Sequence, residues 1–407
     1  MRSPASPLRP GRLAAGLVLV LATGCGASDD GLAWSVRRGQ VGEFAVAGTH
    51  VFTIGREVAV HDVADGRRLR RAALPADLGD ITIGQLGPGA MLAGDALVFG
   101  WYDFRTDTGT VFCYDAASLA RRWHWEIRWP WTERSLRPSV AVVADARHVY
   151  AAAIGKDADN LFAFRLGDGR LAWIRSVETF PAEAALALDG DRLLVRSQLW
   201  ARPGDRHEQL DAIAIQDGRR LWRTWLTGEA KHHAGGPLVH DGHLYTTTRA
   251  GVARGRLFTV RLADGHTTRD DVPTSGAPIA RSGGVVWFGG WPPIAYDVVA
   301  RRTVWRATLG RPENDGPPMI AGGRLDRDRR RVLTGDSRRF VYELAADTGA
   351  LQDRIRLDTY PRFELFSPVK ALYGSYGVRR LELHGGMLLV GTVDSSLFAF
   401  RRTGGER

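Results

Sequence analysis

A unit of about 47 residues recurs along the chain, and a repeat of this length limits the fold to propellers, solenoids and similar arrays. In each unit an alternating apolar strand ends in an acidic turn, and a short strand that often carries tryptophan follows. The apolar strand occurs as Val58–Val63, Gly109–Tyr114, Leu161–Arg165, Leu210–Ile215, Leu257–Leu262, Ile294–Tyr296, Phe340–Leu344 and Leu397–Arg401. These are eight copies of one unit.

A second hairpin precedes most of these copies, with a turn rich in Gly and Asp. Its turns are Asp145–Arg147, Asp189–Asp191, Asp241-Gly242, Ser282–Gly284 and His384–Gly386. Two hairpins in each unit predict four antiparallel strands. Four-stranded units repeated radially form a β-propeller, so we expect an all-β, eight-bladed propeller.

The two ends of the chain predict how the ring closes. Asp30–Trp34 repeats Asp168–Trp173, whereas Leu397–Arg401 repeats Leu161–Arg165. The first fragment lacks the strands before it and the last lacks the strand after it, so together they make one blade. An N-terminal strand that completes the C-terminal blade leaves no exposed edge between the two ends. A solenoid would need polar caps, which are not evident.

The N-terminus has the features of an export signal. Three arginines precede an apolar run, Leu13–Ala22, which is too short to span a bilayer permanently. Leu21–Cys25 resembles a bacterial lipobox, which implies cleavage before Cys25 and acylation of that cysteine. An ordinary signal cut elsewhere, with Cys25 a bystander, is the alternative. The expected organisation is a lipoprotein signal peptide over 1–24, a lipidated tether over 25–30, the propeller over 31–403 and a C-terminal tail over 404–407.

The propeller repeat resembles a known family. A strand such as Leu161–Phe164 followed by Asp-Gly-x-x-x-Trp is similar to the pyrroloquinoline-quinone-type (PQQ-like) repeat, across essentially all of 31–403. The resemblance implies that tryptophans dock neighbouring blades, and it assigns this role to Trp34, Trp123, Trp173, Trp222 and Trp305. Leu69, His266 and Leu351 stand at the corresponding places in the blades that depart from the pattern. No Trp-Asp dipeptide occurs, so the WD-type propeller is a poorer match.

The cysteines and histidines favour a protein without catalytic residues, cofactor or metal. Family members that use the quinone typically carry a vicinal disulfide and a calcium ion, but Cys25 and Cys113 are not adjacent. Cys113 lies in an alternating strand and is expected to be a buried small hydrophobe rather than a nucleophile. Four histidines, two of which flank a predicted hairpin turn, could hold a metal or simply be solvated, and we favour solvation. They are His232, His233, His240 and His243.

Arginine dominates the basic residues: 55 Lys+Arg face 45 Asp+Glu, and all but three of those bases are arginine. Arginine pairs recur before the last strand of several units, at Arg67-Arg68, Arg121-Arg122, Arg219-Arg220 and Arg301-Arg302. Because equivalent turns of a propeller share a face, the pairs predict a positive rim that suits an anionic lipid surface or an acidic protein. The alternative is solvated turns in an arginine-rich chain.

Two long connections carry aromatic residues that a core does not require. Exposed Trp and Arg are typical anchors of protein interfaces, and long loops in compact folds are usually functional. Packing over the propeller's own surface is the alternative. The candidate partner-binding residues are Trp129, Trp131, Arg134 and Arg137 in one connection and Tyr360, Phe363 and Phe366 in the other.

These features together resemble the outer-membrane protein assembly factor BamB family of propeller lipoproteins. The resemblance implies a non-enzymatic scaffold, monomeric within a complex, at the periplasmic face of the outer membrane, with envelope partners such as the β-barrel assembly machinery. An enzyme with a site in the central channel and a surface receptor for glycan or another small ligand are the alternatives. Nucleic acid is not an expected partner, because the signal predicts export.

Overall fold

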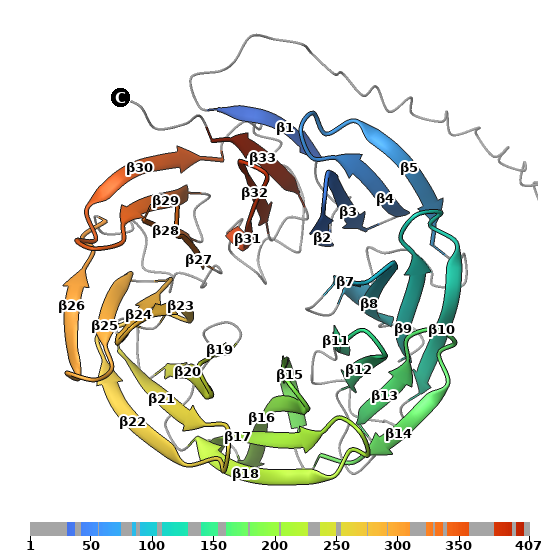
Figure 1. Ribbon diagram of the computed structural model, residues 1–407, viewed down its shortest axis with the longest axis horizontal. Helices are drawn as coiled ribbons and strands as arrows, with labels where there is room; N and C mark the ends of the chain where they lie inside the picture. The colour runs from blue at the N-terminus through green and yellow to red at the C-terminus, as the bar shows by residue number, and fades with distance from the viewer. Residues whose placement is uncertain are drawn as a thin grey trace, which may run out of the picture.

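The computed structural model of the chain is a closed ring of eight β-sheets (Figure 1). It describes residues 31–36, 42–55, 57–74, 84–86, 90–103, 108–128, 140–153, 160–177, 180–202, 205–226, 237–249, 254–274, 276–290, 292–309, 323–328, 330–336, 340–357, 378–392 and 396–402. Within these residues every regular element is a strand. The expected all-β, eight-bladed propeller is confirmed.

The first four blades follow one another along the chain. Blade I contains β2 (Glu43–Ala47), β3 (His50–Ile54), β4 (Glu57–Asp62) and β5 (Arg68–Ala73). Blade II contains β6 (Gly84–Leu86), β7 (Met91–Ala93), β8 (Ala96–Asp103), β9 (Thr108–Asp115) and β10 (Arg121–Arg128). Blade III contains β11 (Val140–Ala144), β12 (His148–Ala153), β13 (Leu161–Arg165) and β14 (Leu171–Arg175). Blade IV contains β15 (Phe180–Asp189), β16 (Arg192–Arg202), β17 (Asp205–Ala214) and β18 (Arg220–Leu226).

The last four blades complete the ring. Blade V contains β19 (Leu238–His240), β20 (His243–Arg249), β21 (Gly255–Arg261) and β22 (Thr267–Val272). Blade VI contains β23 (Pro278–Ser282), β24 (Val285–Phe288), β25 (Ile294–Asp297) and β26 (Arg302–Arg306). Blade VII contains β27 (Gly323–Asp326), β28 (Arg331–Gly335), β29 (Phe340–Ala345) and β30 (Leu351–Arg356). Blade VIII contains β31 (Val378–His384), β32 (Met387–Thr392), β33 (Leu397–Arg401) and the N-terminal β1 (Leu32–Val36).

The N-terminal strand closes the ring as the sequence predicts. β1 pairs antiparallel with β33, with Trp34 opposite Ala399 and Val36 opposite Leu397. It is the outer strand of blade VIII, whose other three strands come from the C-terminus (Figure 1). The backbone N–H of Arg401 also donates to the carbonyl of Gly31 at 2.8 Å. The first and last described segments therefore belong to one sheet.

Blade II departs from the simple four-strand pattern. Its innermost position is occupied by two short strands, β6 and β7, which both pair with β8. Leu86 lies opposite Trp101, and Met91 lies opposite Val98. The order of the other strands is the same as in the remaining blades.

The hydrophobic core lies between blades rather than at one centre. Eight buried clusters each draw side chains from two neighbouring blades, one cluster for each junction of the ring. Both faces of a blade are therefore covered, and a middle strand such as β13 is buried at four consecutive residues, Leu161–Phe164. Burying apolar surface contributes about 25 cal/mol per Å², so the junctions are the main source of the ring's stability.

Candidate functional site

Five tryptophans link the outer strand of one blade to the next blade. Each indole N–H donates to a backbone carbonyl across the junction, and the carbonyl lies three residues before a turn glycine. The bonds run from Trp34 to Val63 at 2.9 Å, Trp123 to Leu166 at 2.8 Å, Trp173 to Ile215 at 2.8 Å, Trp222 to Leu262 at 2.9 Å and Trp305 to Ala346 at 2.9 Å. These are the tryptophans to which the family resemblance assigns docking.

Each indole ring also lies against the turn glycine of the next blade. A Cβ placed on Gly218 would lie 2.7 Å from the ring of Trp173, closer than real Cβ contacts. Gly66, Gly169, Gly265 and Gly349 meet their tryptophans in the same way. The φ angle of Gly218 is +71°, a conformation that L side chains rarely adopt. Glycine is thus required at these turns both by the backbone and by the neighbouring ring.

The residue opposite each of these tryptophans within its own blade is small. Trp173 pairs with Ala163, Trp222 with Ala212, Trp305 with Ala295 and Trp34 with Ala399. In blade II the residue opposite Trp123 is Cys113. A tryptophan at this position therefore accompanies a small residue on its partner strand and a glycine on the next blade.

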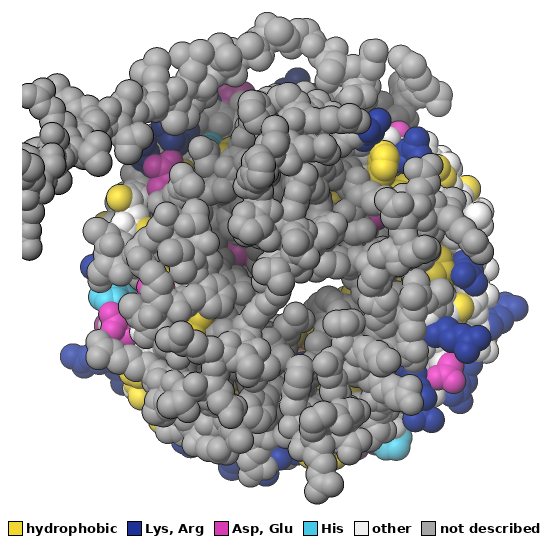
Figure 2. All heavy atoms as spheres, turned by 180° about the vertical axis from the view of Figure 1, so that it is seen from behind, with side chains coloured by type: hydrophobic (Ala, Val, Ile, Leu, Met, Phe, Trp, Pro, Cys, Tyr) yellow, Lys and Arg dark blue, Asp and Glu magenta, His cyan; other side chains and the backbone are white. Residues whose placement is uncertain are grey.

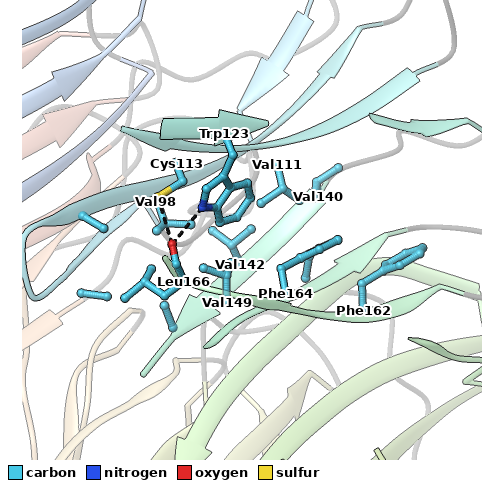
Figure 3. Close-up of a cluster of buried hydrophobic side chains, with 14 of the residues drawn as sticks. Val98, Val111, Cys113, Trp123, Val140, Val142, Val149, Phe162, Phe164 and Leu166 are labelled. Atoms are coloured by element: carbon cyan, nitrogen blue, oxygen red, sulfur yellow. Dashed lines mark hydrogen bonds between the residues drawn. The ribbon is translucent and has the colours of Figure 1, made fainter. Parts of the chain in front are cut away.

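Cys113 behaves as a member of the core. Its Sγ lies 3.9 Å from the carbonyl oxygen of Leu166, which also accepts the Trp123 indole N–H (Figure 3). Val98, Val142 and Phe164 surround the pair. Burial raises the pKa of the Cys113 thiol to about 11, so the thiol is protonated at neutral pH. This environment is typical of a buried small hydrophobe and not of a nucleophile.

Two glycines in blade IV separate the effect of the ring contact from the effect of φ. Gly190 has a φ of +58° and would meet nothing within 4 Å, whereas Gly218 meets Trp173. We expect Gly190→Ala to lower the free energy of unfolding by about 1 kcal/mol, the cost of the left-handed conformation. Gly218→Ala adds a steric conflict and should lower it by about 3 kcal/mol. Urea unfolding followed by circular dichroism measures both, and equal losses would refute the ring contact.

The strand register corrects the positions that were expected to replace tryptophan in blades I, V and VII. The residues opposite the third strand at the tryptophan level are Arg70, Thr268 and Asp353, not Leu69, His266 and Leu351. The outer strands of blades I and VII contain the same β-bulge as the tryptophan-bearing strands, so Arg70 and Asp353, four residues after the turn glycines Gly66 and Gly349, stand at the tryptophan level. In blade V the pairing runs without a bulge.

The three junctions that follow these blades have other contacts. Leu69 of blade I packs against the cluster that contains Leu119, which has a φ of 60° at the turn position held elsewhere by glycine. Arg301 has a φ of 52° at the same position in blade VI, and its guanidinium reaches back to Asp270 of blade V. In blades II and VI, the position of the turn glycine is therefore occupied by a residue with a side chain, and the preceding blade has no docking tryptophan.

The junction between blades VII and VIII contains a buried ion-pair group. Arg402, just after β33, contacts Asp326 and donates to Glu343 at 2.9 Å. The side chains of Arg402 and Glu343 are each 5% exposed. Arg331 also donates to Glu343, at 2.6 Å. The C-terminal end of the closing blade is therefore fixed to blade VII by charge as well as by apolar packing.

The predicted arginine pairs all lie at the start of an outer strand or directly before it. Figure 2 shows basic side chains around the outer edge of the ring. Five of the eight are within ion-pair distance of a carboxylate: Arg67, Arg68, Arg122, Arg219 and Arg301. The Arg122 guanidinium bridges Asp95 and Asp115 and holds the pKa of Asp115 well below its usual range. Local carboxylates therefore offset part of the positive charge of the predicted rim.

Several predicted residues lie outside the described part of the chain. They are Cys25, Trp129, Trp131, Arg134, Arg137, Tyr360, Phe363, Phe366, His232 and His233. His240 and His243 are described. The Nε2 atom of His240 lies 3.1 Å from Oδ2 of Asp241, and Nδ1 of His243 lies 2.8 Å from the Asp241 carbonyl oxygen. The described residues contain no group of three or more His, Cys, Asp or Glu side chains arranged to hold a metal ion. They also contain no helix long and apolar enough to cross a membrane.

A buried polar group between blades IV and V was not predicted. Arg196 and Glu208 are almost completely buried, with Arg196 Nε 3.2 Å from Glu208 Oε2. Arg196 also donates to Thr246 of blade V at 2.7 Å. Burial raises the pKa of Glu208. The alternation of side chains along a strand is the signal that could have found this group. Arg196 stands two residues after Leu194 and Glu208 two residues before Leu210, so each shares a strand face with a leucine.

Comparisons with known proteins agree with this geometry. The sequence matches the family described as outer membrane protein assembly factor BamB over residues 23–271. None of the curated proteins matches it significantly. BamB from Moraxella catarrhalis is a similar solved structure, with a TM-score of 0.62 and 13% sequence identity over 91% of this chain and 99% of that chain. Quinohemoprotein alcohol dehydrogenase ADHIIG from Pseudomonas putida HK5 has a TM-score of 0.61 and 13% identity over 93% of this chain and 77% of that chain. The computationally designed Ika8 protein has a TM-score of 0.59 and 11% identity over 90% of this chain and 97% of that chain. At these identities the structural likeness shows the fold alone.

Proposed function

The chain belongs to the family of the outer membrane protein assembly factor BamB, and we propose that it acts as a non-enzymatic, protein-binding scaffold of a bacterial cell envelope. The family assignment carries this proposal. A ring whose junctions are tied by indole hydrogen bonds and ion pairs is suited to the role, because a stiff body loses little conformational entropy when it binds.

We further propose that the propeller is anchored at the periplasmic face of the outer membrane through Cys25. The apolar run and the lipobox-like segment before this cysteine support cleavage after residue 24 and acylation. Acyl chains contribute about 0.8 kcal/mol for each buried CH₂, so two or three chains hold a domain at a bilayer. Residues 25–30 then serve as the tether.

The partner-binding residues that we propose lie in the two aromatic connections. One contains Trp129, Trp131, Arg134 and Arg137, and the other contains Tyr360, Phe363 and Phe366. Tryptophan, tyrosine and arginine dominate the binding energy of most protein interfaces. The proposed partner is a subunit of the β-barrel assembly machinery.

Purification of the full-length tagged chain from detergent-solubilised envelopes tests the proposal. We expect a β-barrel insertase to co-purify with the protein. The double variant Trp129→Ala/Trp131→Ala should weaken this association about thirtyfold or more, because hot-spot residues contribute at least about 2 kcal/mol. Trp225→Ala is the matched control, because Trp225 is exposed on β18, outside both connections.

Two results would contradict the scaffold. A quinone chromophore or stoichiometric calcium in the purified protein, with no insertase, would favour the enzyme with a site in the central channel. Retention of a glycan or another small ligand, again without an insertase, would favour the receptor. The structural likeness to a quinohemoprotein alcohol dehydrogenase makes the chromophore measurement worth including.

A further inference from the structure

The outer strand of blade I carries an unusual concentration of positive charge. β5 contains Arg68, Arg70 and Arg71 but no acidic residue, and Arg67 precedes it. The side chains of Arg67 and Arg71 are 72% and 63% exposed, and Arg70 is also exposed. Arg70 occupies the tryptophan level of this strand, so an arginine points outward where other blades dock a ring. We call Arg67, Arg68, Arg70 and Arg71 the blade I strip.

Two carboxylates lie close to the blade I strip and leave it with excess positive charge. Glu57 of β4 pairs with Arg68 at 2.9 Å and with Arg71 at 3.5 Å. Asp65 is 3.9 Å from Arg67. Four guanidinium groups therefore face two carboxylates. By contrast, β22 carries one arginine, Arg269, beside Asp270 and Asp271.

The blade I strip adjoins the point where the N-terminal segment joins the ring. Trp34 of β1 donates its indole N–H to Val63, and its ring packs against Gly66, the residue directly before Arg67. β1 and β5 are the outer strands of neighbouring blades (Figure 1). The strip is thus fixed beside the first strand of the propeller.

Chain length brings this edge close to any membrane to which Cys25 is attached. Six residues separate Cys25 from Leu32, the first residue of β1. A fully extended chain of that length reaches about 25 Å. Leu32 must then stay within this distance of the bilayer surface, and the blade I strip lies on the neighbouring outer strand. Electrostatic attraction acts over about 8–10 Å at physiological salt.

We infer that the blade I strip is a docking surface for anionic phospholipid headgroups, which turns this edge of the propeller toward the membrane. The inference rests on the proposed lipid anchor for its orientation. Guanidinium groups bind phosphate in bidentate fashion, and the strip's excess positive charge complements phosphatidylglycerol or cardiolipin. An acidic protein is the less favoured occupant, because only the membrane is brought to this edge by the length of the tether.

Vesicle sedimentation tests the inference without the anchor. The probe is the mature chain with Cys25→Ser, which carries no acyl group, mixed with phosphatidylcholine vesicles that contain or lack phosphatidylglycerol. We expect binding only to the anionic vesicles and loss of binding at high salt. Arg67→Gln/Arg70→Gln/Arg71→Gln should reduce the partition coefficient by about a hundredfold, since each arginine near the surface contributes about fivefold.

The control removes the same charge from distant outer strands. Arg220, Arg302 and Arg306 are exposed on β18 and β26, each three blades from blade I, and their triple Gln variant should bind as the parent does. Equal losses in the two triple variants would overturn the inference in favour of a diffuse charge effect. If the blade I triple variant loses a co-purified protein but binds vesicles as the parent does, the lipid inference is overturned in favour of a protein interface. If insertase capture succeeds while vesicle binding fails, only the lipid surface is refuted.

Discussion

Replacement of Trp123 by alanine is expected to lower the free energy of unfolding by about 3–5 kcal/mol, as for other buried aromatic side chains. Trp123 is 9% exposed, and its ring packs 5.9 Å from that of Phe164 in the next blade. The change also removes the indole donor from the Leu166 carbonyl and leaves the weak Cys113 thiol contact at 3.9 Å. Urea unfolding followed by far-ultraviolet circular dichroism gives the value.

Trp225 provides the control for that experiment. It occupies an outer strand of the same kind but is 45% exposed. Trp225→Ala should change the free energy of unfolding by about 0.5 kcal/mol or less, as is usual for surface substitutions. If the two variants lose the same stability, the junction contact has no special role and docking by tryptophan is wrong.

Replacement of Arg402 by methionine is expected to lower the free energy of unfolding by about 3 kcal/mol. Methionine keeps most of the apolar volume but removes the charge that faces Asp326 and Glu343 in blade VII. Both carboxylates are at most 12% exposed, so water does not compensate them fully. Thermal and urea unfolding of the variant measure the loss.

The neighbouring Arg401 is the matched control, because its side chain is exposed at the end of β33. Arg401→Met should leave stability nearly unchanged. If Arg402→Met keeps the parent stability, the ion pairs do not hold the closing blade.

Two local features made the closure of the ring predictable from sequence. Asp30–Trp34 and Leu397–Arg401 each repeat part of an internal unit and each lack what the other supplies, so the pairing of β1 with β33 follows from the repeat. Two of the docking tryptophans, Trp173 and Trp222, are also visible, because each follows the glycine of an Asp-Gly turn by four residues. Trp123 and Trp305 follow turns that begin with aspartate but lack this glycine. The alternation of apolar residues is a local property, so it can be recognised without knowing how the neighbouring blades are placed.

The occupants of the remaining junctions were not predictable in the same way. Leu69 was expected at the tryptophan level, but the strand register places Arg70 there. In blade V the outer strand lacks the bulge found in the tryptophan blades, which places Thr268 at this level, and a single sequence does not reliably show whether a strand contains a bulge. Arg301 and Arg402 form their ion pairs with residues of other blades, so their partners depend on how the blades are placed.

The sequence by itself determined the strand pattern of the repeat, the number of blades and the pairing of the two ends. Each of these follows from comparing short segments of the chain with the repeated unit. Only the tertiary structure decided which arginines are neutralised and which face outward. Arg122 is bridged by Asp95 and Asp115, whereas Arg70 lies on a strand without acids beside β1. The physical reason is that charge pairing depends on distances across strands and between blades, which spacing along the chain does not encode.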